Sequence, residues 1–200
     1  MTFRAQGPII HHLMNSYSGP RTNALPLILG VTTLFEGLRA GAGTFRLLLD
    51  LPARHDLGPV AFAAFSRATD LSTRGIVFYS FYGVGGALLT GTTWIAVKRA
   101  KVDRSIRQLS GAACISSLLV LALTTQAAPL MWGVGRSRDA ALLRDLLDRF
   151  TVWTTFRIGL VDLSFLAVLS ALVLLATTNR GGAQQLPDVL AIPHPESVHR

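Results

Sequence analysis

Long runs of apolar residues alternate with short polar segments along most of this chain. An α-helix needs about 20 residues to cross the hydrocarbon core of a bilayer, because each residue adds ~1.5 Å and the core is ~30 Å thick. Four runs are of this length, and they predict membrane spans over residues of about 24–45, 75–97, 109–131 and 152–178. The pattern therefore predicts an all-α fold, an integral membrane four-helix bundle that occupies residues 24–178.

The segment between the first two predicted spans contains Pro52 and the pair Gly58-Pro59, which interrupt regular structure. After them, the apolar residues of Pro59–Leu71 recur at helical spacing. This spacing predicts a short amphipathic helix that turns its apolar face toward the bilayer or the bundle. The residues of that face are Val60, Phe62, Ala63 and Phe65.

The two ends of the chain are polar. Residues 1–23 precede the first apolar run, and residues 179–200 contain three prolines among polar residues, which predicts a disordered C-terminal tail. A cleaved signal peptide is an alternative for the first run, because Ala40-Gly41-Ala42 resembles a cleavage site. Glu36 and Arg39 interrupt the apolar region that a signal peptide needs, so a membrane span is favoured.

Composition and charge agree with a membrane protein. Half of the 200 residues are hydrophobic, 15% are charged and the formal net charge is +8. The basic residues lie between the apolar runs and form no continuous stripe, which favours contact with lipid headgroups over nucleic acid. Residues 98–107 hold five Lys or Arg residues and one Asp. Because short basic loops face the cytoplasm, we expect both termini to be cytoplasmic, with the chain in the plasma membrane.

Four charged residues interrupt the predicted spans: Glu36, Arg39, Arg157 and Asp162. A charge inside a span costs roughly 2.5–3.5 kcal/mol on insertion scales, so such groups face a partner or a watered cavity. Glu36 and Arg39 are three residues apart on one helical face. Across the bundle, we expect Glu36 to pair with Arg157, or Asp162 to pair with Arg39.

These charges have two interpretations. In the first, the ion pairs only fix the register of the helices. In the second, they form a polar pocket in which Glu36 or Asp162 is a catalytic base. Arg39 and Arg157 then bind an anionic substrate, with hydrogen bonds from Tyr79 and Tyr82. The predicted spans contain no histidine, and Cys114 is the only cysteine, so the sequence predicts no metal site and no cofactor.

Three short segments resemble one known family. They are Phe35–Gly41 (FEGLRAG), Ala128-Pro129-Leu130, and the segment from Arg149-Phe150 through Arg157 into an apolar run. Together they resemble the four-helix membrane family of mostly uncharacterised proteins that includes the anthrone oxygenases. The resemblance covers residues 24–178. It implies a cofactor-independent oxygenation, in which Glu36 or Asp162 removes an acidic C–H proton from a hydrophobic aromatic substrate and the carbanion reacts with dioxygen.

A second class of function fits the same pattern. A membrane bundle with paired internal charges also suits a non-catalytic protein, either an accessory subunit of a membrane complex or a small-solute transporter. Association with further copies of itself or with a membrane complex is compatible with both classes. A cavity lined by the charged residues favours the enzyme, whereas a tightly packed interior favours the accessory role.

Overall fold

The computed structural model describes the backbone of residues 24–184 and the side chains of residues 24–178. Its elements are α2 (Ala24–Phe45), a π-helical turn η2 (Arg46–Asp50), α3 (Leu51–Ala68), α4 (Thr73–Arg99), α5 (Arg104–Arg136) and α6 (Ala140–Gln184). This part of the chain contains no strand, so the prediction of an all-α fold is confirmed. The predicted polar segment 1–23 and residues 185–200 of the predicted tail lie outside the described residues.

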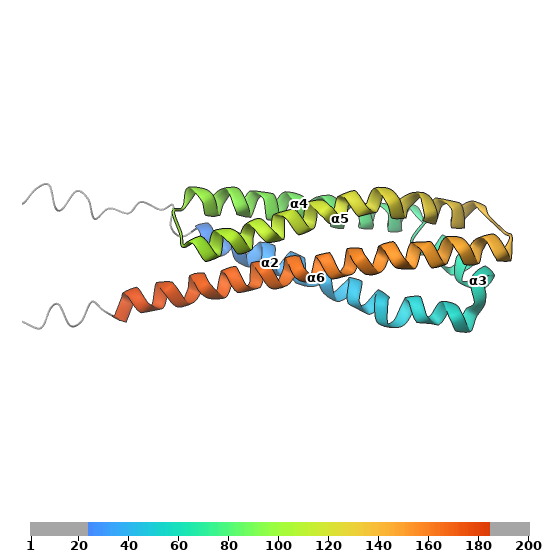
Figure 1. The fold of residues 1–200 in the computed structure, drawn as a ribbon, viewed down its shortest axis with the longest axis horizontal. Coiled ribbons are helices and arrows are strands. Elements are labelled where there is room, and N and C mark those ends of the chain that lie inside the picture. Colours follow the sequence, from blue (N-terminus) through green and yellow to red (C-terminus); the bar gives the residue numbers. More distant parts are fainter. Residues whose placement is uncertain (1–23, 185–200) are drawn as a thin grey trace, which may run out of the picture.

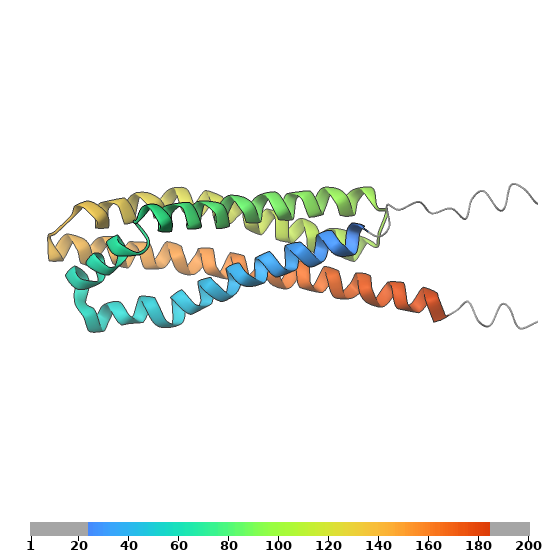
Figure 2. The same ribbon diagram turned by 180° about the vertical axis from the view of Figure 1, so that it is seen from behind.

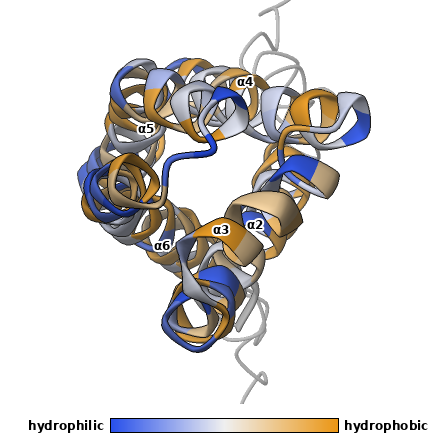
Figure 3. Cartoon of the chain, turned by 90° about the vertical axis from the view of Figure 1, so that its right-hand side faces the viewer, coloured by the Kyte–Doolittle hydropathy of each residue, from blue (hydrophilic) through white to orange (hydrophobic). Residues whose placement is uncertain are grey.

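The long helices α2, α4, α5 and α6 lie side by side along one axis (Figures 1 and 2). Seen along that axis, they surround a common centre, and α3 lies across one end (Figure 3). α5 packs against α4 and α6, and α2 packs against α6 and α4. Near its N-terminus α2 approaches α4, and toward Phe45 the two helices diverge (Figure 2). This divergence leaves space between them at the end that carries α3.

Three helical stretches are long and apolar enough to cross a membrane: Ala24–Ala68, Arg104–Arg136 and Ala140–Thr178. Only 33%, 33% and 39% of their most apolar windows are buried inside the protein. Large apolar side chains such as Leu27, Leu34 and Ile115 are therefore turned outward, with exposed fractions of 69%, 68% and 60%. An outer surface of this kind is typical of a protein whose surroundings are as apolar as its interior.

α4 is 27 residues long, which is enough for a span, but it is not one of these three stretches. Glycine, threonine and tyrosine make up much of its sequence. The second predicted span, residues 75–97, lies within this helix. Its crossing of the membrane stays a prediction.

Both ends of the helical bundle are closed by apolar clusters. At the end that carries α3, Phe62 and Ala63 pack with residues of α5 and α6, including Met131, Leu143 and Phe150. The opposite end has its own cluster, formed by Leu25, Leu29, Val97, Ile106, Ala171 and Leu175. Between these two clusters, buried polar side chains such as Glu36, Arg39 and Ser164 lie beside two smaller apolar clusters.

α5 and α6 extend beyond the predicted spans. The connection between the two helices is short, because only Ser137–Asp139 separate them. Asp139 Oδ1 accepts hydrogen bonds from the backbone N–H groups of Ala141 (2.8 Å) and Leu142 (3.3 Å), which caps α6 at its start. α6 also continues to Gln184, beyond the end of the fourth predicted span at residue 178.

The predicted amphipathic helix forms the second half of α3. The helix bends at Gly58, whose φ of 76° is readily adopted only by glycine, and its second half runs from Pro59 to Ala68. Phe62 and Ala63 are buried, whereas Val60 and Phe65 are 49% and 46% exposed. The four apolar residues therefore divide between the core and the outer surface, instead of sharing one face.

Phe62 is 2% exposed and belongs to the cluster that fastens α3 to α5 and α6. Phe62→Ala should lower the free energy of unfolding by about 3–5 kcal/mol, because it removes buried apolar surface and leaves a cavity. Thermal unfolding of the purified protein in detergent measures the effect. The control is Phe156→Ala, since Phe156 is 62% exposed. Equal losses in the two variants would show that α3 does not pack as described.

Candidate functional site

A cavity of about 420 Å³ lies between α2, α4, α5 and α6, in the half of the bundle that carries α3. Its walls are mostly apolar, as is usual for small-molecule sites. The polar residues that line it come from four helices and two connecting segments. They include Arg39, Arg46, Asp70, Tyr79, Tyr82, Thr124, Thr154 and Arg157. The structure thus brings together all four residues that the sequence suggests for substrate binding.

The two predicted catalytic bases do not line this cavity. Glu36 is fully buried one turn before Arg39, and Asp162 lies on α6 beyond the cavity-lining residue Val161. Asp70 is the carboxylate that the lining contains, and no local pattern in the sequence points to it. It lies in the turn between α3 and α4, in a segment that looks like an ordinary polar loop.

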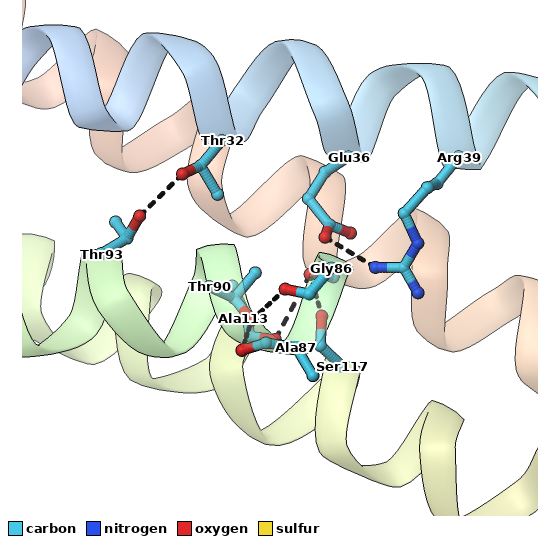
Figure 4. Close-up of polar contacts among 10 residues, drawn as sticks. Thr32, Glu36, Arg39, Gly86, Ala87, Thr90, Thr93, Ala113 and Ser117 are labelled. Atoms are coloured by element: carbon cyan, nitrogen blue, oxygen red, sulfur yellow. Dashed lines mark hydrogen bonds and ion pairs between the residues drawn. The ribbon is translucent and has the colours of Figure 1, made fainter. Parts of the chain in front are cut away.

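Glu36 and Arg39 form a buried ion pair within α2. Arg39 Nη1 donates to Glu36 Oε1 at 2.6 Å, and the side chains are 0% and 4% exposed for Glu36 and Arg39. Both side chains point from α2 toward α4, where the guanidinium lies against Gly86 (Figure 4). A Cβ at position 86 would lie 1.8 Å from Arg39 Nη1, so no larger residue fits there without moving the arginine.

The predicted ion pairs between helices are wrong. Glu36 is bound by Arg39 of its own helix and not by Arg157. Asp162 accepts a hydrogen bond from Thr44 Oγ1 at 3.5 Å and forms no ion pair with Arg39. The local pair prevails because residues three apart already share a helical face, so it forms without the ordering of a second helix.

A second polar cluster joins three segments of the chain near the end that carries α3. Arg46 of η2 donates to Asp70 through both terminal nitrogens, one of them at 2.9 Å from Oδ1. Tyr79 of α4 donates to Asp70 Oδ1 at 2.9 Å and also contacts Arg46. The Arg46 guanidinium lies 5.6 Å from the centre of the Phe150 ring, a cation–π contact with α6. This cluster fixes the η2 turn and the start of α4 around the cavity.

Arg157 of α6 has a different environment. Within residues 24–178, no carboxylate lies at ion-pair distance from it. The charged or ionisable groups close enough to act on it are Arg46, Tyr79 and Arg39. Its Nε atom is buried and has no hydrogen-bond partner in the described part of the protein. The hydroxyl of Thr154, one turn earlier on the same wall, is buried without a partner as well.

Aromatic side chains form the wall on the α4 side. The ring of Tyr82 lies 4.3 Å from that of Phe78 and 5.5 Å from that of Phe35, measured between ring centres. Trp132 and Phe150 line other parts of the cavity. Flat aromatic surfaces of this kind can stack on the rings of an aromatic ligand.

The described residues contain no group of three His, Cys, Asp or Glu side chains that could hold a metal ion. Comparison with protein families, curated proteins and solved structures found no match to this chain. The chemistry of the site is therefore inferred from its geometry.

Glu36→Gln should lower the free energy of unfolding by about 3–5 kcal/mol, because it leaves the Arg39 charge buried without its partner. Adding Arg39→Met should restore most of this loss, since the double variant buries no unpaired charge. The melting temperature in detergent is the measurement.

The matched control for this ion pair is Asp145→Asn. It removes an exposed i,i+4 pair with Arg149, whose side chains are 54% and 66% exposed, and should cost well under 1 kcal/mol. If the double variant were no more stable than Glu36→Gln alone, the loss would not come from the unpaired charge.

Proposed function

We propose that this chain is an integral membrane protein that crosses the plasma membrane four times, through α2, α4, α5 and α6, with both termini in the cytoplasm. The outward-facing apolar side chains of these helices support the proposal. α4 is long enough to cross as well, and it contributes Tyr79, Tyr82 and Gly83 to the cavity. The bilayer is then the first partner of the protein.

The orientation is testable with single introduced cysteines. Ser105 and Arg138 are exposed and lie at opposite ends of the bundle, beside the α4–α5 and α5–α6 connections. In intact cells, a membrane-impermeant maleimide should label Arg138→Cys, and should label Ser105→Cys only after permeabilisation, because the basic connection faces the cytoplasm. The unaltered chain, whose Cys114 is buried, is the control. The opposite labelling pattern would reverse the orientation.

We further propose that the cavity binds a hydrophobic aromatic molecule. The single observation that carries this proposal is the cavity itself. It has a volume of about 420 Å³, within the range of small-molecule sites, and it combines apolar and aromatic walls with a few convergent polar groups. A non-catalytic bundle whose helices serve only as a scaffold has no need for such an opening in its centre.

The resemblance to the anthrone-oxygenase-like family extends this proposal to catalysis without a cofactor. Removal of a C–H proton from an anthrone gives a delocalised carbanion. Reaction of this carbanion with dioxygen, followed by loss of water, converts one anthrone and one O₂ into one anthraquinone and one H₂O. We assign the base to Asp70, supported by Tyr79, in place of Glu36 and Asp162, because Asp70 reaches the cavity. Arg39 and Arg157 lie where they can stabilise the carbanion.

Filling the cavity should abolish binding. Ala128 lines the cavity on α5, and Ala128→Phe should weaken binding of anthrone about tenfold or more by occupying its space. Quenching of tryptophan fluorescence measures binding, and oxygen uptake measures turnover. The control is Ala122→Phe, because Ala122 lies on the same helix, is exposed and does not line the cavity.

The two readouts separate the possible results. The catalytic proposal is supported if Ala128→Phe loses both binding and oxygen uptake while Ala122→Phe retains both. Binding without oxygen uptake in the unaltered protein would refute the catalytic step and leave a binding protein. If anthrone does not bind the unaltered protein, the aromatic ligand is wrong and the accessory or transport role is favoured.

A further inference from the structure

The three arginines that line the cavity differ in how their charges are balanced. Arg39 is paired with Glu36, and Arg46 is paired with Asp70. Arg157 is the third, and within residues 24–178 it has no acidic partner. The described lining therefore carries one positive charge that the side chains around it do not neutralise.

This charge is placed where it is costly. Arg157 lies on α6 inside a stretch apolar enough to cross a membrane, and the groups that act on it include the two other arginines. A positive charge in such surroundings is stabilised only by a partner or by water. Within the described residues, no group accepts a hydrogen bond from its buried Nε atom.

Two further polar residues of the cavity lining contain an atom without a hydrogen-bond partner. The Thr154 hydroxyl and the Nε–H of Arg46 both belong to residues that line the cavity, and both are buried without a hydrogen-bond partner among the described residues. All three atoms, Arg157 Nε included, are enclosed by protein in this structure, so the terminal nitrogens of the Arg157 guanidinium are the donors that a molecule in the cavity can reach. A group with several lone pairs and a negative charge complements such a set, and planar oxyanions match the guanidinium best.

We propose that Arg157 binds the oxyanion of an amphiphilic ligand, such as a carboxylate, whose apolar body occupies the rest of the cavity. The apolar wall is supplied by residues such as Val120, Leu121 and Val161. The inference rests on the proposed binding function and specifies the chemical class of the ligand. It is independent of catalysis, because a non-catalytic carrier of an acidic amphiphile needs the same site.

The experiment compares two probes that differ in charge and little in shape, 9-anthracenecarboxylate and 9-anthracenemethanol. The full-length protein in a non-ionic detergent should bind the carboxylate at least about tenfold more tightly than the alcohol. One charge-assisted hydrogen bond accounts for a difference in affinity of this size. Arg157→Met should remove this preference and leave binding of the alcohol within about twofold. The matched control is Arg149→Met, because Arg149 is an exposed arginine of the same helix.

A second measurement separates a binding role from a structural one. If Arg157 serves the ligand, Arg157→Met should raise the melting temperature of the ligand-free protein, because an unneutralised charge is replaced by an apolar side chain of similar length. Addition of the carboxylate should raise the melting temperature of the unaltered protein and not that of the variant. A ligand-free variant that is less stable or fails to fold would show that Arg157 holds the bundle together, and would overturn the inference.

The probes also separate this inference from the function on which it rests. Failure of both probes to bind would refute the binding function. Equal binding of both would leave that function intact and refute the anion site.

Competition then identifies the source of the anion. Displacement of the carboxylate by phosphatidylglycerol and not by phosphatidylcholine would assign the site to an anionic lipid, and no displacement by either would assign it to a free acidic molecule. Both results uphold the anion site.

Discussion

The seating of the Arg39 guanidinium against the backbone of α4 is the interaction on which the interior of this protein depends. Its charge is neutralised by Glu36 of the same helix, and its flat face requires the absence of a side chain at Gly86. The pair is formed within one helix, so it brings a nearly neutral polar unit into the bundle instead of two separate charges. α2 and α4 can then approach closely at this point while they remain apart farther along.

Pairs of hydroxyl groups also join the long helices in this region, beside small apolar clusters. The hydroxyls of Thr32 and Thr93 lie 2.7 Å apart between α2 and α4, and those of Ser117 and Ser164 lie 3.2 Å apart between α5 and α6 (Figure 4 shows the first pair). Hydroxyl pairs hold helices together without a large apolar interface, as they do between membrane helices. The tight middle of the bundle thus gives way to a cavity at the end that carries α3, where α2 and α4 diverge.

Charge distribution gives this cavity its chemical character. Two of its three arginines are neutralised by carboxylates, and the third is not, within the part of the chain that is described. An apolar space with one unneutralised guanidinium suits a molecule with an apolar body and an acidic end. The same arrangement would also stabilise a carbanion formed in the cavity, so binding and the proposed oxygenation draw on one electrostatic feature.

The sequence by itself determined the all-helical fold and the apolar outer surface, because apolar runs of this length report directly on helices that cross a bilayer. It also suggested Arg39, Arg157, Tyr79 and Tyr82 as candidate site residues, because polar side chains within such runs are costly and must meet a partner, and all four line the cavity. The tertiary structure alone decided which groups meet. Arg46 and Asp70 are 24 residues apart and become neighbours only when η2 and the α3–α4 turn fold over the end of the bundle. Likewise, Glu36 and Asp162 were placed away from the cavity by the rotation of α2 and α6, which depends on side-chain packing and leaves no periodic signal in the sequence.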